Sequence, residues 1–172
     1  MTTAALHKAL FLDRDGVLNV DTGYPHRVED LVMIDGADRA VAMAHAAGYK
    51  VFIVTNQGGI ALNYFTEEDM TAFHDHMVSI INKGGGVITD IAFCPHHPKS
   101  PDPGLRECDC RKPQPNMILD LARRHNIDLT RSLMVGDRES DIAAGQAAGC
   151  PAHLFEGGRL DDFISPLLRA AS

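Results

Sequence analysis

An apolar run that ends in two acidic residues is the feature that most constrains the fold of this chain. Residues 9–12 read Ala-Leu-Phe-Leu and lead directly into Asp13-Arg14-Asp15-Gly16. The run lacks the alternation of a half-exposed strand, so it predicts a buried strand of a parallel sheet. Ligands of open α/β sheets bind at the carboxyl edge, where both acids would lie. The pair therefore suits a divalent cation or an aspartyl-phosphate nucleophile, although an Asx turn would use the same residues.

The bulk properties of the 172-residue chain suit one globular domain, which we expect to span residues 1–172. A net charge of −7 disfavours a nucleic-acid surface, and no apolar run approaches the length of a membrane span. Residues 1–8 lack the pattern of a signal peptide. We therefore expect a cytoplasmic monomer with no nucleic-acid or membrane partner. In that compartment the four cysteines should be metal ligands or core residues rather than disulfides.

Strand and helix patterns alternate along the rest of the chain. Further strands are predicted at 50–54, 87–93, 132–135 and 152–155. Helices are predicted from 35 or 36 to 47, from a Thr66 cap to 83, from 115 through 122, from 142 to 147 and from 160 to 170. In the helix after 141, we expect Ile142, Ala143 and Ala147 to face inward. This alternation predicts a doubly wound parallel sheet.

Three of the predicted strands end in polar residues that the fold would bring to one edge of the sheet: Asp13, Thr55 and Asp137. Together with Asp15, the two aspartates at these ends could supply oxygen ligands to Mg²⁺. Asp141, one helical turn after Asp137, could orient these ligands or hold a water molecule. It could equally be an ordinary first-turn acid that favours the helix dipole.

The same edge could bind a phosphoryl group. Thr55 and Asn56 offer a hydroxyl and an amide to phosphate oxygens, although both residue types also form caps and turns. Lys112 is a point charge suited to the phosphoryl group, and Arg111 could bind a second phosphate. The alternative for this Arg-Lys-Pro segment is solvated surface charge. With these groups in place, Asp13 would attack phosphorus, and Asp15 would protonate the leaving alkoxide and then deprotonate water.

The four motifs of the haloacid dehalogenase (HAD) superfamily of phosphatases are matched, in order and spacing, by Asp13-x-Asp15-Gly16, Thr55-Asn56, Lys112 and Gly136-Asp137 through Asp141. This resemblance implies a Rossmann-like fold, with Asp13 as the nucleophile and Asp15 as the general acid/base. It also implies that Mg²⁺ is held by Asp13, the backbone carbonyl of Asp15, and Asp137.

A Pro- and Cys-rich loop, which we place as a zinc-binding insertion at residues 94–110, precedes Lys112. Cys94 is followed by His96 and His97, and the pair Cys108 and Cys110 comes next. Three thiolates and one imidazole can close a tetrahedral zinc site, which would be structural because it leaves no open position. Spacing alone does not separate His96 from His97 as the fourth ligand.

Longer stretches resemble the D-glycero-D-manno-heptose-1,7-bisphosphate 7-phosphatases and the related histidinol-phosphate phosphatase domains: Phe11 to Gly16, Asp21-x-Gly23-Tyr24, Thr55-Asn56-Gln57-x-Gly59-Ile60-Ala61, Cys94 to Pro98, and Cys108 to Pro113. The resemblance implies zinc ligands Cys94, His96, Cys108 and Cys110, and no large cap domain. It implies that Thr55 and Lys112 hold the transferred phosphoryl group. The residues expected to contact substrate are Asp21, Thr22, Gly23, Tyr24, Asn56, Gln57, Gly58, Arg111 and Arg138.

The leading hypothesis is a Mg²⁺-dependent phosphatase that removes the 7-phosphate of a heptose bisphosphate in the synthesis of lipopolysaccharide or a related glycan precursor. Two departures from the family pattern bear on the choice of ester: Leu62-Asn63 stands where a basic residue is common, and Arg138 where lysine is frequent. The alternatives are a phosphatase for histidinol phosphate or another small ester, and a non-catalytic zinc-stabilised protein that binds a phosphorylated ligand. A DNA 3′-phosphatase lacks support from the negative net charge.

Overall fold

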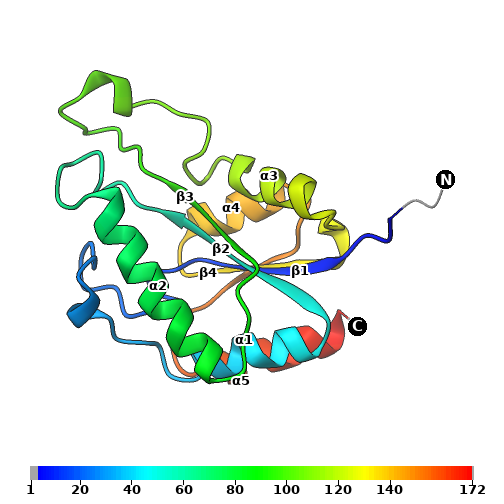
Figure 1. The fold of residues 1–172 in the computed structure, drawn as a ribbon. Helices are drawn as coiled ribbons and strands as arrows, with labels where there is room; N and C mark the ends of the chain where they lie inside the picture. Colours follow the sequence, from blue (N-terminus) through cyan, green and yellow to red (C-terminus); the bar gives the residue numbers. More distant parts are fainter. Residues whose placement is uncertain (1–3, 172) are drawn as a thin grey trace.

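A five-stranded parallel sheet forms the centre of the computed structural model, which describes residues 4–171 (Figure 1). The strand order is β3-β2-β1-β4-β5. The strands are β1 (Lys8–Leu12), β2 (Tyr49–Asn56), β3 (Asp90–Cys94), β4 (Leu133–Gly136) and β5 (Ala152–Leu154). The prediction of a doubly wound parallel sheet is therefore confirmed.

Helices cover both faces of the sheet (Figure 1). The helices are α1 (Ala37–Ala46), α2 (Glu67–Lys83), α3 (Asn116–His125), α4 (Glu139–Ala147) and α5 (Leu160–Ala170). Helices α1, α2 and α5 share one hydrophobic core with the sheet, and α3 and α4 share the other. The 24 residues between β1 and α1 contain one short 3₁₀ helix, Val28–Asp30, and no further helix or strand that could form a separate cap over the carboxyl edge.

Strand β1 is the middle strand, and its position determines which side chains meet. Leu12 lies beside Ile53 of β2 on one side and Val135 of β4 on the other. All three side chains are fully buried, as expected for a strand covered on both faces. The residues that follow them along the chain, Asp13 and Asp137 among them, therefore emerge together at the carboxyl edge.

Local sequence signals explain where several helices begin and end. The predicted Thr66 cap is present: its hydroxyl accepts from the Asp69 N–H at 3.1 Å, and the Asp69 carboxylate accepts from the Thr66 N–H at 2.9 Å. Helix α1 ends before Gly48, whose φ of +87° lies in the left-handed region that favours glycine.

Strand β3 is shorter than predicted. It begins at Asp90 rather than Val87. Val87 and Thr89 are exposed, and the parallel register with β2 starts at the pair of Phe52 and Asp90. A strand predicted from the run of hydrophobic residues therefore started too early in the sequence.

The predicted inner face of α4 is wrong. Ala143 and Ala147 are exposed, whereas Ala144 and Gly145 are buried. A Cβ atom at Gly145 would lie 2.9 Å from the Cβ of Ala152, so this helix packs very closely against the sheet. In an alanine-rich helix, small residues rather than large ones form the buried face, and hydrophobic periodicity misses them.

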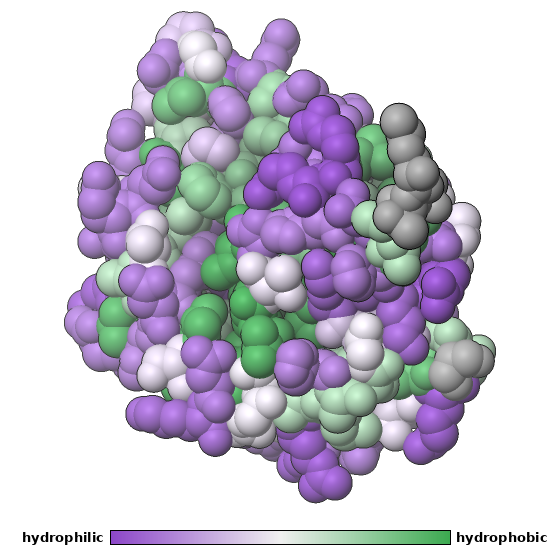
Figure 2. All heavy atoms as spheres, turned by 45° about the vertical axis from the view of Figure 1, so that its right-hand side comes forward, coloured by the Kyte–Doolittle hydropathy of each residue, from purple (hydrophilic) through white to green (hydrophobic). Residues whose placement is uncertain are grey.

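The face of the molecule shown in Figure 2 is predominantly hydrophilic, with hydrophobic residues gathered toward its middle. Within residues 4–171, no helix combines the length and apolar character that crossing a membrane would require.

Candidate active site

The carboxyl edge of the sheet carries a pocket of about 330 Å³. It is lined by residues from the ends of β1 and β2, the loop at 21–24, the segment at 97–112 and the start of α4: Asp13, Asp15, Asp21, Gly23, Tyr24, Asn56, Gln57, Gly58, His97, Arg111, Lys112, Arg138, Ser140 and Asp141. Most of the sequence-predicted site residues thus meet in one cavity. Apart from the expected zinc ligands, three predicted residues lie outside this lining: Thr22, which is exposed, Thr55, which is buried, and Asp137.

Lys112 binds two carboxylates at the base of the pocket. Its Nζ atom lies 2.9 Å from Asp13 Oδ1 and 2.6 Å from Asp141 Oδ1. The same ammonium group donates to the Val54 carbonyl at 2.8 Å. Lys112 is 4% exposed, so its charge is fully committed to groups within the site. Removing one partner of such a buried pair costs about 3–5 kcal/mol because it leaves a buried charge unpaired.

Burial and neighbouring charges shift the protonation of this cluster. Burial opposes charge on Lys112, but the carboxylates of Asp13 and Asp141 hold the pKa of the ammonium above its usual value. Burial, together with repulsion by Asp141, raises the pKa of Asp13 to about 8, although Lys112 opposes the rise. Burial also raises the pKa of Asp137. The single positive charge of Lys112 therefore does not neutralise the three acids. A cation bound beside them would balance the remaining negative charge.

The acids have room and free oxygens for that cation. One ligand atom from each of Asp13, Asp137 and Asp141 lies within 4.8 Å of the others. Asp137 Oδ1 is buried without a hydrogen-bond partner, as expected of an oxygen that binds a metal ion. Gly16 makes this arrangement possible, because a Cβ atom there would lie 2.0 Å from Asp137 Oδ2. These residues fit a hard divalent ion such as Mg²⁺.

Asp141 also shapes the start of α4. Its Oδ2 accepts from the backbone N–H groups of Asp137 and Arg138, both at 3.1 Å, while Oδ1 binds Lys112. A Cβ atom at Gly136 would collide with this side chain. Asp141 is 1% exposed, and its carboxylate both binds the backbone at the start of α4 and holds the Lys112 ammonium group.

The carboxyl group of Asp15 is not part of the cluster of three acids. It accepts from Arg14 Nε at 2.9 Å, from Asn19 Nδ2 at 3.0 Å and from Gln57 Nε2 at 3.2 Å. Gln57 Nε2 also donates to the Thr55 hydroxyl at 2.8 Å. With its side chain held in this network, Asp15 would have its backbone carbonyl to offer a metal, as the family resemblance implies.

Basic side chains line the wider part of the pocket. Arg138 Nη2 donates to Asp21 Oδ2 at 3.2 Å and links the start of α4 to the loop at 21–24. Arg111 Nη1 donates to the His96 carbonyl at 3.1 Å. The guanidinium groups of Arg111 and Arg138 therefore stand on the pocket wall with Lys112 at its base.

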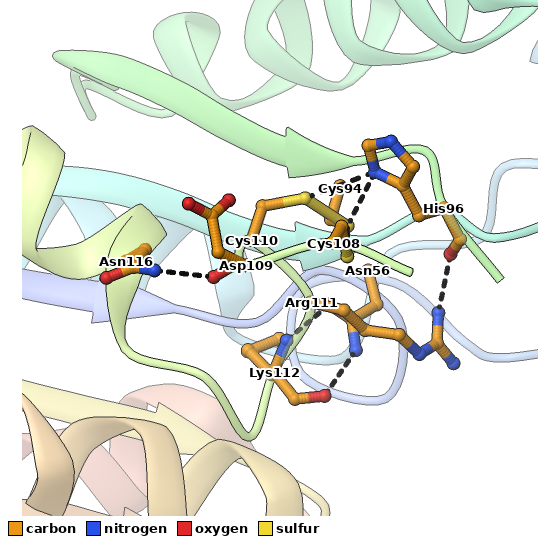
Figure 3. The surroundings of a disulfide bond; sticks show 9 residues. All are labelled: Asn56, Cys94, His96, Cys108, Asp109, Cys110, Arg111, Lys112 and Asn116. Carbon is orange, nitrogen blue, oxygen red and sulfur yellow. Dashed lines mark hydrogen bonds between the residues drawn. A yellow bond between two sulfur atoms is a disulfide. The ribbon is translucent and has the colours of Figure 1, made fainter. Parts of the chain in front are cut away.

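The structure gives Asn56 a different partner from the predicted phosphate. Its Oδ1 accepts from the Lys112 N–H at 3.0 Å, and its Nδ2 donates to the Lys112 carbonyl at 3.1 Å (Figure 3). Both ends of the amide thus hold the Lys112 backbone beside β2. Asn56 lines the pocket, but its side chain positions the lysine.

The predicted zinc ligands lie together at the carboxyl end of β3 (Figure 3). The ligand atoms of Cys94, His96, Cys108 and Cys110 all lie within 4.8 Å of one another. His96 Nδ1 is 3.5 Å from Cys94 Sγ and 3.3 Å from Cys110 Sγ, and Cys94 Sγ is 3.6 Å from Cys108 Sγ. Three sulfurs and one imidazole nitrogen around a common centre match the donors of a structural zinc site.

The connectivity of this cluster differs from the expectation that the cysteines form no disulfide. The structure joins Cys94 and Cys110 in a disulfide, while Cys108 is free. The loop that gathers the four zinc donors also brings these two sulfurs together. A disulfide and a zinc ion would use the same sulfur atoms, so the two states exclude each other.

The geometry separates the two neighbouring histidines. His96 Nδ1 faces the sulfurs, whereas His97 Nδ1 accepts from the Lys99 N–H at 3.0 Å and the ring lines the pocket. Burial and nearby Arg111 lower the pKa of His97. His96 is therefore the histidine placed to bind zinc.

Sequence reasoning missed three of the residues at this site. His97 and Ser140 line the pocket, and Arg14 is completely buried beside Asp15. Arg14 lies between the two motif aspartates, and that position was the signal that could have drawn attention to it.

Comparisons with known proteins agree with the geometry. A family model described as HAD-hydrolase-like matches residues 109–162. A D-glycero-β-D-manno-heptose-1,7-bisphosphate 7-phosphatase of Rhodopseudomonas palustris is 44% identical over 170 residues, covering 98% of this chain and 94% of the relative. The chain belongs to the heptose-bisphosphate phosphatase family of HAD-like hydrolases. Its members named here are phosphoric monoester hydrolases.

Other members of the heptose-bisphosphate phosphatase family differ in the anomer they are named for. A Burkholderia mallei relative, 43% identical over 83% of this chain and 76% of its own length, is named for the α-anomer. The crystal structure of D,D-heptose 1,7-bisphosphate phosphatase from B. bronchiseptica, complexed with magnesium and phosphate, has a TM-score of 0.81. It is 34% identical to this chain, and the match covers 95% of this chain and 99% of that one.

Proposed function

We propose that this chain is a Mg²⁺-dependent phosphatase that hydrolyses the 7-phosphate of D-glycero-D-manno-heptose 1,7-bisphosphate through an aspartyl-phosphate. The observation that carries the proposal is the pairing of Lys112 with Asp13 at the base of a pocket whose wall bears Arg111 and Arg138. One cation lies beside the nucleophile, and further cations lie where a second phosphate of the same molecule could bind. The names of the relatives support this substrate class.

In the first step, an Asp13 carboxylate oxygen attacks phosphorus and forms a P–O bond. The bond between phosphorus and the O7 oxygen of the sugar breaks, and the Asp15 carboxylic acid gives its proton to that oxygen. Lys112 and the hydroxyl of Thr55 offset the negative charge on the phosphoryl oxygens.

In the second step, Asp15, now a carboxylate, removes a proton from a water molecule. The water oxygen attacks phosphorus, and the bond between phosphorus and the Asp13 oxygen breaks. Inorganic phosphate leaves, Asp13 is again a carboxylate and Asp15 again holds a proton. The donors from Arg14, Asn19 and Gln57 keep the Asp15 carboxyl group in one orientation through both steps.

Two metal sites complete the proposal. Asp13, Asp137 and the Asp15 backbone carbonyl would hold Mg²⁺, which supplies charge neutralisation for the phosphoryl group when bound. Cys94, His96, Cys108 and Cys110 would hold a structural zinc ion in the reduced protein. This zinc site would keep the loop that leads to Arg111 and Lys112 in place.

The proposal is tested by the release of phosphate from a panel of esters with Mg²⁺ present. The panel contains both anomers of the heptose bisphosphate, histidinol phosphate and simple hexose phosphates. We expect the bisphosphates to have the highest kcat/KM. Preference for histidinol phosphate by a wide margin would show that the proposed substrate is wrong.

Asp13→Asn tests the nucleophile with almost no change in shape. We expect turnover to fall by at least about 10³-fold, as when the nucleophile of another hydrolase is removed. Asp75→Asn, on the exposed face of α2, is the matched control and should keep full activity. Normal turnover by Asp13→Asn would exclude the covalent mechanism.

A further inference from the structure

Arg14 is the largest completely buried side chain among the described residues, although arginine always carries a charge. It follows the nucleophile Asp13 and precedes the acid/base Asp15. Its guanidinium carbon lies 4.4 Å from the centroid of the Phe73 ring in α2. A buried charge is rarely the most stable way to fill a core, since hydrophobic residues of similar volume often do as well or better. The contacts of this side chain therefore deserve a functional explanation.

The guanidinium group binds both oxygens of Asp15. Nε donates to Oδ1 at 2.9 Å, and Nη2 donates to Oδ2 at 3.1 Å. Such a two-pronged contact prevents the carboxyl group from rotating about its own axis. Arg14 therefore fixes the plane of the Asp15 carboxyl group where this residue lines the pocket.

Two further contacts fix the guanidinium group itself. Nη2 donates to the Pro25 carbonyl at 2.9 Å, next to the loop at 21–24 that lines the pocket. Nη1 lies 3.2 Å from His74 Nε2 in α2. Because arginine can only donate, His74 must accept at Nε2. Burial and the charge of Arg14 lower the pKa of His74 to about 3, which keeps the ring neutral for this role.

We propose that Arg14, held by His74, is a positioning residue that aligns the Asp15 carboxyl group with the leaving oxygen and links it to the loop that contacts substrate. This inference rests on the proposed function, in which Asp15 is the general acid. The inference gives His74 an indirect part in proton transfer, although this residue lies at least 59 positions from either motif aspartate in the sequence.

The leaving group of the substrate provides the test. A sugar alkoxide needs a proton as it departs, whereas the p-nitrophenolate of p-nitrophenyl phosphate departs without one. We expect Arg14→Gln to lower kcat/KM for the heptose bisphosphate about tenfold or more beyond its effect on the aryl ester, a part of the 10²–10⁴-fold that general acids contribute. Equal losses on both esters would show a merely structural role and overturn the proposal.

A pair of His74 variants keeps the test decisive if Arg14→Gln fails to fold, as judged by thermal unfolding. His74→Leu removes the acceptor for Nη1, whereas His74→Gln can offer an oxygen near the position of Nε2. We expect the leucine variant to show the same selective loss on the sugar ester and the glutamine variant to recover it. Arg27→Gln, which removes an exposed pair with Asp30 near the same loop, should change neither ester.

Asp15→Asn separates failure of this inference from failure of the proposed function. It should show the selective loss on the sugar ester more strongly than any other variant. If Asp15→Asn shows no dependence on the leaving group, the acid role of Asp15 in the proposed function is wrong. If Asp15→Asn shows it but the Arg14 and His74 variants do not, the positioning role alone is excluded.

Discussion

The buried ring of His74 leads, at the scale of a single residue, to a prediction about pH. Its pKa is about 3 in the folded chain and near the ordinary 6.5 in the unfolded chain, and the charge that faces it is that of Arg14. Below pH 6.5 the unfolded chain therefore binds a proton that the folded chain does not, so stability falls as pH decreases toward 3. Between pH 7 and pH 5 this group should cost about 2 kcal/mol of the free energy of unfolding.

Urea unfolding of the wild type and His74→Gln at both pH values measures this effect. We expect the variant to lose less stability on acidification, because glutamine does not titrate. Other groups that bind protons, including the cysteine and histidine cluster, are present in both proteins and cancel in the difference. An identical loss in both would contradict the assignment of a neutral buried histidine.

Contacts such as that of His74 also mark how far sequence reasoning reaches at this site. Asp13, Asp15, Asp137 and Lys112 could be selected because strand ends and motif spacing point to one edge of the sheet. The partners of those residues could not be selected, because they depend on distances across the fold. Asp141 bridges Lys112 and the start of α4, and Arg14 contacts His74, which lies 60 positions away in helix α2. No periodicity or spacing encodes such contacts.

At the scale of elements, the helices and strands were predicted best where large apolar residues repeat. The α2 stripe of Met70, Phe73 and Met77 is buried as the pattern indicates. The pattern failed in α4, where Ala144 and Gly145 pack against the sheet because they are small. The hydrophobic pattern also did not predict the structure of the loop before Lys112. In that loop, sulfur and imidazole groups take the place of a hydrophobic core.

That loop leads to a prediction about metal content. We expect one zinc ion per chain by elemental analysis of protein prepared under reducing conditions, and loss of zinc to lower activity because Arg111 and Lys112 follow the cluster directly. Thiol titration of the denatured protein separates the two states, since all four cysteines react in the zinc form and two react in the disulfide form. The measurement requires a chelator in the assay to release the zinc-bound thiols.

Two serine variants control for the loss of a cysteine as such. Cys108→Ser should lose zinc, because it removes one of the four clustered donors. Cys150→Ser should retain it, because this cysteine is buried elsewhere, where burial raises the pKa of its thiol to about 12. Full zinc content in Cys108→Ser, or no zinc in the reduced wild type, would refute the site.

At the scale of the whole molecule, the site depends on the relative placement of distant parts of the chain. The pocket is lined by residues at the ends of β1 and β2, by the loop before α3 and by the start of α4, which follows β4. The order of these strands in the sheet was not fixed by the sequence. The unfolded chain has no such arrangement. A ligand of the assembled site should therefore stabilise the molecule as a whole rather than one element.

Thermal unfolding with Mg²⁺ and inorganic phosphate checks this expectation. At ligand concentrations about 100-fold above Kd, binding adds about 2.7 kcal/mol, which for a chain of this size corresponds to roughly 5–10 °C in Tm. Asp13→Asn should lose much of the shift, because it removes one of the charged metal ligands. A shift of the same size in this variant, or none in the wild type, would argue against binding at the carboxyl edge.

The basic groups on the pocket wall have a consequence for how substrate arrives. The chain as a whole carries a charge of −7, and the pocket is lined by Arg111, Lys112 and Arg138 beside four aspartates. A polyanion therefore gains attraction at this opening only once bound Mg²⁺ offsets the carboxylates, so productive encounters depend on the long-range field of the metal-loaded site. Dissolved salt weakens that field over about 10 Å. The rate of substrate capture should therefore fall as ionic strength rises, while the rate of bond breaking in the bound complex should stay the same.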